Sequence, residues 1–132
     1  MKKIILDTNF LMVPLQFRVD IFSEFNRICD FNYRLYIFER TIDELRTIVE
    51  KQPAKHKKAA QFGLKLIKLK NIGLLKSGQS GVDNDILEYA GKDVIIATQD
   101  AELKRELREK NIPIIILRQK KYLQLVEGKL YK

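Results

Sequence analysis

The segment Lys3-Ile-Ile-Leu-Asp-Thr-Asn9 places an acidic side chain directly after a short apolar run. Ile4 to Leu6 has the composition of a buried strand, and Asp7 follows it without a spacer. A second acid, Asp100, follows the apolar run from Val94 to Thr98 after one intervening residue. If the two strands are parallel, both carboxylates emerge at the same edge of the sheet, which is where such sheets bind ligands.

Two more acids are expected at that edge. Asp83 opens a helix after the segment Lys76-Ser-Gly-Gln-Ser-Gly81, and Glu44 lies in the first turn of a helix that follows a strand. Each acid alone has a local explanation: Asp7 in a turn, Asp83 and Asp100 as helix N-caps, and Glu44 at the end of a capping box. The box would start at Thr41. None of these explanations accounts for four carboxylates meeting at one edge.

A cluster of four carboxylates favours metal chemistry. Without an equal number of cations, converging carboxylates repel one another and are costly to remove from water, and a bound metal ion relieves both effects. Oxygen ligands without Cys or His select Mg²⁺ or Mn²⁺ over zinc. Two such ions about 4 Å apart can stabilise the attacking and leaving oxygens of a phosphodiester displacement. Asp7, Glu44, Asp83 and Asp100 therefore point to metal-dependent cleavage of a phosphodiester.

The overall charge indicates which substrate this chemistry would serve. The 132 residues include 25 Lys and Arg against 17 Asp and Glu, a net charge of +8. A positive field of this size favours polyanionic partners, and nucleic acid is the first of them. Lys57, Arg118, Lys120 and Lys121 are candidate contacts to phosphates.

Continuously apolar strands alternate with amphipathic helices along the chain, which is typical of a parallel sheet covered on both faces. The periodicity predicts strands at 4–6, 33–38, 72–75, 93–98 and 112–117, and helices at 19–30, 41–49, 54–69 and 83–91, with a charged helix ending at Lys110. We expect one domain over residues 1–132, a three-layer α/β/α sandwich around a parallel sheet of about five strands. A loop containing Pro14 is expected after the first strand, and Tyr122 to Tyr131 are expected to add an edge strand or hairpin.

Cysteine and histidine offer little to a catalytic site here. Cys29 is the only cysteine and lies on the apolar side of its helix, so we expect a buried thiol. The one histidine, His56, lies in a lysine run that we expect to be solvated. Met1-Lys-Lys is followed by only three apolar residues before Asp7, too few for a signal peptide, and no apolar run approaches the ~20 residues of a membrane span. A cytoplasmic protein without a membrane partner is expected.

Together these residues resemble the PIN-domain endoribonucleases. The resemblance rests on ILDTN at the first strand end, IDEL around Glu44, GVDNDILEYA around Asp83 and IIATQDAELK around Asp100, and it covers nearly the whole chain. The segment NFLMVPLQFRVDIF is similar to the archaeal branch related to the Fcf1 and Nob1 ribosomal-RNA processing nucleases. The chain length also suits VapC toxins.

The resemblance implies an Mg²⁺- or Mn²⁺-dependent endoribonuclease that cuts single-stranded RNA. It makes Asp7, Glu44, Asp83 and Asp100 the acidic constellation, and our hypothesis is that Asp7, Asp83 and Asp100 carry the metal while Glu44 completes or orients a second site. Asn9 and Thr98 match polar positions that line the pocket in the family, and they take supporting roles.

The resemblance leaves the cellular role open. RNA processing would imply a ribosome-assembly partner, and a VapC-type toxin would imply an antitoxin. PIN-like proteins are often dimers, and Leu123, Leu125 and Val126 are apolar residues suited to a homodimer interface.

Two assignments stay open within this interpretation. Asp83 stands seven residues before Ala90, which matches the third acid of the family, while Asp85 would then support the site or face solvent. Glu102 is interpreted as a first-turn acid favoured by the helix dipole. The short Gly78 to Gly81 pattern is interpreted as a mobile connection beside the site.

Two other functions remain as alternatives. An aspartyl phosphatase would use Asp7 as nucleophile, but it would want a second acid two residues later, where this chain has Asn9. A non-catalytic RNA-binding or ribosome-assembly module would use the same fold, although the presence of all four acids argues against a degenerate site. No phosphate-binding Walker loop is present.

Overall fold

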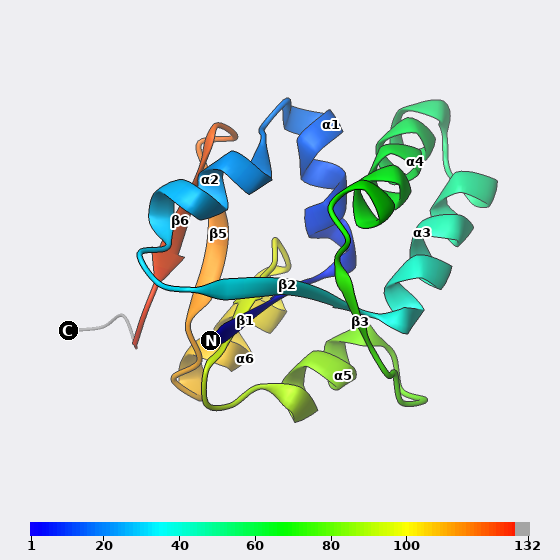
Figure 1. Cartoon of the computed structure of the whole chain (residues 1–132). Coiled ribbons are helices and arrows are strands. Elements are labelled where there is room, and N and C mark those ends of the chain that lie inside the picture. Colours follow the sequence, from blue (N-terminus) through cyan, green and yellow to red (C-terminus); the bar gives the residue numbers. More distant parts are fainter. Residues whose placement is uncertain (129–132) are drawn as a thin grey trace.

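The computed structural model describes residues 1–128 and folds them around one six-stranded sheet (Figure 1). The strands are β1 (Lys2–Leu6), β2 (Tyr33–Phe38), β3 (Gly73–Leu75), β4 (Val94–Ala97), β5 (Ile114–Arg118) and β6 (Tyr122–Val126). The helices are η1, a 3-10 helix (Thr8–Met12), α1 (Val13–Phe17), α2 (Ile21–Ile28), α3 (Glu39–Lys51), α4 (Ala54–Leu69), α5 (Val82–Tyr89) and α6 (Ala101–Glu109). No helix of this described part is both long and apolar enough to cross a membrane.

The strand order decides where a site can form. The sheet runs β3-β2-β1-β4-β5-β6, and all neighbouring pairs are parallel except β5 with β6. The chain moves outward from β1 to β2 and β3 on one side, then returns to β4 on the other side of β1. The order therefore reverses between β1 and β4, and a crevice opens outside the carboxyl ends of these two strands.

Helices cover both faces of the sheet, as the apolar strands require. Along β1, Ile4 and Leu6 face the core under η1 and α1 to α4, while Ile5 faces the core shared with α5 and α6. β4 alternates in the same way, with Ile95 in the first core and Ile96 in the second. Because successive strand residues point to opposite faces, two buried faces require unbroken apolar strands. The expected α/β/α sandwich is confirmed.

The segment after β1 differs from the expectation. A loop was expected around Pro14, but residues 8–17 form η1 and α1, with Pro14 in the first turn of α1. Proline is tolerated there because the first turn has no intrahelical acceptor for its missing N–H, and its fixed φ suits the helix. The consequence is a rigid connection directly after Asp7.

The helix after β2 begins earlier than expected. α3 starts at Glu39 with Phe38 as its N-cap, so Thr41 lies inside the helix and is fully buried. The predicted capping box from Thr41 to Glu44 is therefore wrong, because a buried threonine two residues into the helix cannot cap it. Glu44 lies one turn further along the helix, where its side chain is free to face the site.

The C-terminal expectation is confirmed in part. β6 pairs antiparallel with β5 and adds the expected edge strand, while residues 129–132 lie outside the described residues. Leu123 and Val126, suggested above for a dimer interface, are instead buried in the two cores of the chain, and Leu125 packs half-buried against the first core. Strand alternation places Leu123 and Leu125 on the α2 side of the sheet. Cys29 is a buried free thiol, as expected.

Candidate active site

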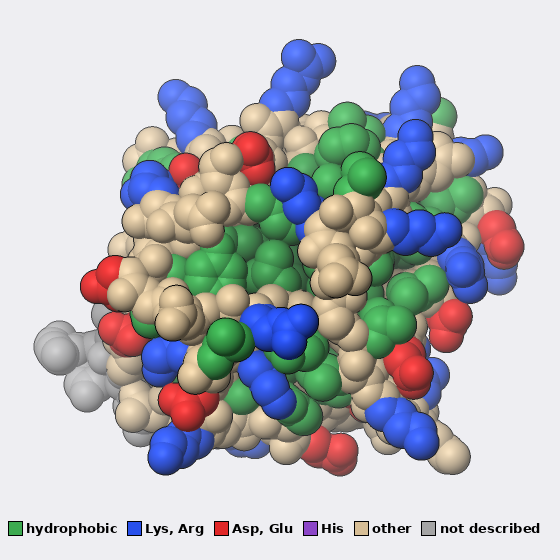
Figure 2. Space-filling view, viewed as in Figure 1, with side chains coloured by type: hydrophobic (Ala, Val, Ile, Leu, Met, Phe, Trp, Pro, Cys, Tyr) green, Lys and Arg blue, Asp and Glu red, His purple; other side chains and the backbone are tan. Residues whose placement is uncertain are grey.

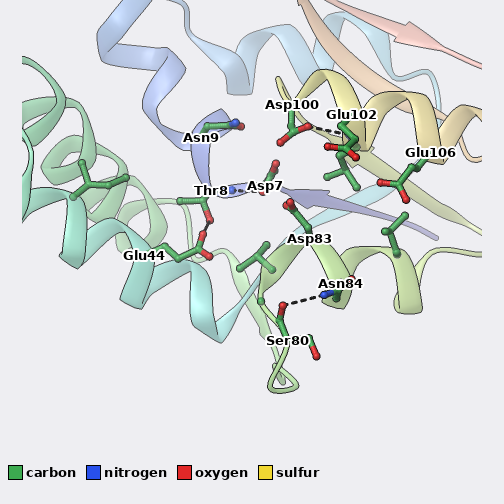
Figure 3. A pocket seen from close by; sticks show the side chains of 15 residues that line it. Asp7, Thr8, Asn9, Glu44, Ser80, Asp83, Asn84, Asp100, Glu102 and Glu106 are labelled. Atoms are coloured by element: carbon green, nitrogen blue, oxygen red, sulfur yellow. Dashed lines mark hydrogen bonds between the residues drawn. The ribbon is translucent and has the colours of Figure 1, made fainter.

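A pocket of about 590 Å³ opens at the carboxyl ends of β1 and β4, at the predicted position (Figure 3). All four predicted acids line it: Asp7, Glu44, Asp83 and Asp100. They come from four different segments, the end of β1, α3, α5 and the start of α6. Asn9 also lines the pocket, on η1. Residues far apart in the sequence are thus brought to one cavity by the reversal of strand order.

Asp7 is the most buried of these acids, with 4% of its surface exposed. Its Oδ1 accepts a hydrogen bond of 2.8 Å from the backbone N–H of Thr8, and its Oδ2 accepts one of 2.7 Å from the hydroxyl of Thr98. Thr98 is fully buried, so it does not line the pocket itself but fixes the carboxylate that does. Its Oγ1 in turn accepts 3.1 Å from the backbone N–H of Asp100.

Glu44 is anchored to η1, the short helix that Asp7 caps. The Thr8 hydroxyl donates to Oε1 of Glu44, and it lies 3.3 Å from the hydroxyl of Thr41. Thr8 therefore contacts two predicted acids at once, through its N–H and its hydroxyl (Figure 3). Sequence reasoning missed this residue, because only the packing of α3 against η1 brings Glu44 to Thr8.

Asp83 and Asp85 lie two residues apart on α5 and have different surroundings. Asp83 is exposed and points into the pocket beside Asp7 and Asp100 (Figure 3). Asp85 is buried with 6% exposure, does not line the pocket, and accepts 2.8 Å from the backbone N–H of Gly78. The structure thus separates the two alternatives: Asp83 stands with the other acids, and Asp85 holds the loop behind them rather than facing solvent.

The loop before α5 forms hydrogen bonds to side chains of two helices at Gly78. The Arg40 side chain of α3 donates to the carbonyl of Gly78, while Asp85 of α5 accepts from its N–H. Gly81 then begins α5 with φ of +102°, a conformation that suits glycine. The connection that was interpreted as mobile is tied to two helices, each of which carries a pocket acid.

The helix after Asp100 adds acids that sequence reasoning did not place at the site. Asp100 caps α6 by accepting 2.9 Å from the N–H of Leu103. Glu102 and Glu106 line the same pocket from α6, and Glu102 also pairs with Arg105 at 3.8 Å. Their i, i+4 spacing puts both on one side of the helix, a signal that was available in the sequence.

Six carboxylates line the pocket, and among its fifteen lining residues there is no Lys or Arg. Burial raises the pKa of Asp7 to about 6, against the opposing effect of the hydrogen bonds from Thr98 and Thr8. The charges of Asp83 and Glu44 raise the pKa of Asp7 further. The partial removal of Asp83 from water also raises the pKa of its carboxyl, with added repulsion from Asp100, Glu106 and Glu102. The pocket therefore favours either protons or a cation.

The donor set fits a hard divalent cation, because every candidate ligand is a carboxylate oxygen. Within residues 1–128 no three Asp, Glu, His or Cys side chains are arranged so that they could enclose a metal ion. An open site is compatible with Mg²⁺, which usually keeps several waters and takes only one or two carboxylates from the protein.

The predicted phosphate contacts lie outside the pocket. Lys57, Arg118, Lys120 and Lys121 are all exposed, and none of them lines the cavity. Arg118 ends β5 at the pocket edge of the sheet, and Lys120 lies 6.0 Å from the ring centre of Phe17. The acids and the predicted basic contacts thus occupy separate parts of the surface.

The fold and the pocket define an α/β protein with an acid-lined site at the switch point of a mostly parallel sheet. The sequence profile of a family described as a PIN like domain matches residues 4–120. The chain belongs to this family.

Two curated proteins are similar over most of their length. Ribonuclease VapC4 of Methanocaldococcus jannaschii is 35% identical over 127 residues, which cover 95% of this chain and 97% of that protein. Ribonuclease VapC9 of Archaeoglobus fulgidus is 29% identical over 119 residues, which cover 89% and 84%.

Two solved structures share the fold. The PIN domain endonuclease Utp24 superposes with a TM-score of 0.72 at 20% sequence identity, covering 98% of this chain and 96% of that one. A domain of a functionally unknown protein from Methanocaldococcus jannaschii gives a TM-score of 0.59 at 16% identity, covering 100% and 98%. At these identities the likeness concerns the fold alone.

Proposed function

We propose that this protein is a metal-dependent endoribonuclease that hydrolyses phosphodiester bonds in single-stranded RNA. The observation that carries the proposal is the meeting of Asp7, Glu44, Asp83 and Asp100 in one pocket without a basic lining residue, in a chain of net charge +8. Membership of the PIN-like family and two relatives named as ribonucleases support it.

In this proposal Asp7, Asp83 and Asp100 would hold the divalent ion, Mg²⁺ or Mn²⁺, one or two of them directly and the rest through waters that the ion keeps. Once bound, such an ion lowers the pKa of water and stabilises negative charge on a phosphodiester. Thr98 and the N–H of Thr8 fix both oxygens of Asp7, so this carboxylate needs little reorientation when it binds.

The other residues position the substrate and the acids. Thr8 holds Glu44 at the side of the pocket, where it completes or orients a second metal site. Asn9 is exposed at the rim, and its amide can donate to a phosphate oxygen. Glu102 and Glu106 extend the negative surface along α6 and increase the attraction of the pocket for cations.

The VapC relatives favour a toxin role over ribosomal-RNA processing. Both curated relatives carry the VapC name, and one of them matches this chain at 35% identity over nearly its full length. The shared fold with the endonuclease Utp24, at 20% identity, does not distinguish the two roles. We therefore propose a VapC-type toxin whose partner is an antitoxin.

Cleavage of a labelled single-stranded RNA tests the proposed activity. The purified protein is assayed with Mg²⁺, with Mn²⁺ and with EDTA, beside Asp7→Asn prepared identically. We expect cutting with either metal, none with EDTA, and loss of cutting in the variant. Tight binding of several RNAs without metal-dependent cutting would contradict the proposal and favour a non-catalytic RNA-binding module.

Growth of a host that expresses the chain tests the proposed toxin role. Induction of the wild type is expected to arrest growth, and induction of Asp7→Asn at the same protein level is expected to leave growth normal. Normal growth with active wild-type enzyme would reject the toxin role and leave the nuclease intact.

A further inference from the structure

One helix next to the site carries charge of a single sign. α4 contains five lysines and no Asp or Glu over its sixteen residues. Lys57, Lys65 and Lys68 are spaced by eight and three residues, so they share one side of the helix, and all three are exposed. We call these three residues the lysine face. Figure 2 shows basic side chains gathered over the part of the molecule where Figure 1 places α3 and α4.

The other charged helix shows that this pattern is not general in the chain. α6 carries Lys104, Arg105 and Arg108 together with Glu102, Glu106 and Glu109, so its charges balance. Mixed charges of this kind are typical of a solvated helix surface with local ion pairs. A helix with five lysines and no acid gains no such pairs along its own length, and its local field attracts polyanions.

Helix α3 lies between the acidic pocket and the groove beside the lysine face. Glu44 and Ile48 of α3 line the acidic pocket, while Arg46 and Val49 line a shallow groove on the other side of the same helix. The full lining of the groove is Arg46, Val49, Glu50, Gln61, Leu64 and Lys65. Only the width of one helix, about 10 Å, separates the two depressions.

α4 is also fixed against the segment that carries the acids. A Cβ on Gly63 would stand 2.9 Å from the backbone oxygen of Leu11, so the backbone of α4 lies directly on η1. η1 also contains Thr8 and Asn9 of the pocket. The distance from the lysine face to the pocket is therefore set by packed secondary structure rather than by a loop.

The pocket itself needs such a surface. With six carboxylates and no basic lining residue, it repels the phosphates of RNA, so the strand must gain its binding energy elsewhere. Exposed lysines supply this energy by releasing counterions from the strand, with little dependence on base sequence.

We propose that the lysine face of α4, together with Arg46 and the groove beside it, is the docking surface for the single-stranded RNA substrate. The strand lies along α4, crosses α3 and enters the acidic pocket with one phosphodiester. This proposal rests on the proposed nuclease function, and the experiment below separates the two.

Binding of a fluorescent 20-nucleotide oligo(U) tests the docking surface. The test variant combines Lys57→Gln, Lys65→Gln and Lys68→Gln. The control combines Arg34→Gln, Lys92→Gln and Lys110→Gln, which removes three exposed charges near the opposite, amino edge of the sheet. The reference protein carries Asp7→Asn alone. The test and control variants carry Asp7→Asn in addition to their own substitutions, so that the RNA stays intact during the titration.

We expect the test variant to weaken binding about tenfold and to reduce the slope of log K against log salt by about 2, the value for three lost contacts to a single strand. The control variant is expected to change both quantities much less. The proposal would be overturned if both variants lost the same RNA affinity, or if the test variant lost none. It would also be overturned if combined Gln substitutions of Arg118, Lys120 and Lys121 weakened RNA binding more than the test variant does.

Cleavage with Asp7 restored separates docking from chemistry. The lysine variant is expected to show a raised KM for the 20-mer and an unchanged kcat. An unchanged KM would count against the docking surface. If the wild type itself binds through α4 but never cuts RNA, the nuclease proposal fails while the docking surface stands.

Discussion

The acidic pocket and the lysine face of α4 stand on opposite sides of α3, and their charges are fully segregated. The pocket has six carboxylates without a basic lining residue, and α4 has five lysines without an acid. Like charges dominate in each region, and within residues 1–128 the one ion pair described for a pocket carboxylate is the exposed contact of Glu102 with Arg105. The comparison indicates that both regions are organised for partners of opposite charge, a cation in one and a polyanion in the other.

The largest expected effect on cleavage comes from replacing Asp83, which lies in the pocket, and the contrast is with Asp85, which lies behind it. Asp83→Asn removes an exposed carboxylate that points into the pocket beside Asp7 and Asp100. We expect cleavage to fall by about 100-fold or more, the scale of losing one preorganised electrostatic contact. The free energy of unfolding should change by less than about 1 kcal/mol, since the lost charge was repelled by its neighbours. Single-turnover cleavage and urea unfolding measure the two effects.

Asp85 provides the matched control two residues away. Asp85→Ala removes the acceptor of the Gly78 N–H, a partly buried hydrogen bond, and should cost about 1 kcal/mol of stability. Asp85→Asn keeps an acceptor oxygen and should recover most of this loss, with cleavage within about tenfold of wild type. If Asp85→Asn instead lost as much cleavage as Asp83→Asn, then Asp85 would be the third acid.

A second prediction concerns how rigidly the pocket holds its central acid. Thr98→Val replaces the fully buried hydroxyl that donates to Asp7 by a methyl group of similar size. Cleavage should fall about tenfold, as is typical when the residue that orients a metal ligand is lost. Measuring cleavage against metal concentration should show a higher requirement for Mg²⁺. Thr98→Ser retains the hydroxyl and serves as control; equal losses in both variants would show that packing, not the hydrogen bond, is responsible.

A third prediction uses the metal-free protein. The pKa of Asp7 is about 6 when folded and 3.8 ordinarily, so the folded state binds the proton more tightly than the unfolded chain does. Stability contributed by this group is therefore present below about pH 4 and lost as the pH rises to about 6. Asp7→Asn cannot titrate, so in EDTA its free energy of unfolding should exceed that of wild type by about 2–3 kcal/mol at pH 7, and most of this advantage should be lost near pH 4. A difference that does not vary with pH would contradict the assignment.

The smallest expected effect concerns the contact that fixes α4 beside the site. Gly63→Ala should lower the free energy of unfolding by about 1 kcal/mol, because the added Cβ meets the Leu11 carbonyl oxygen at 2.9 Å. At an exposed helix position the same change would stabilise by about 1 kcal/mol. Gln61→Ala, exposed two residues earlier, is the control and should change stability little. A stabilised Gly63→Ala would show that α4 can shift relative to η1.

Much of the fold could be predicted because its strands and longer helices follow local patterns of apolar residues. Tyr33–Phe38 and Ala54–Leu69 have the same bounds in the sequence pattern and in the structure. The helical segment around Pro14 and the earlier start of α3 were missed, because proline in a first turn resembles a loop and Phe38 is not a typical cap.

The sequence by itself determined the four acids, the basic charge and the alternation of strands and helices, since each of these depends on residues that are neighbours in the chain. Only the tertiary structure placed Asp83 in the pocket and Asp85 behind it, and brought Thr8 to Glu44. It also buried Leu123 and Val126, which the sequence offered as an interface. The physical reason is that side-chain direction and burial depend on how distant elements pack, and a one-dimensional pattern does not contain this packing.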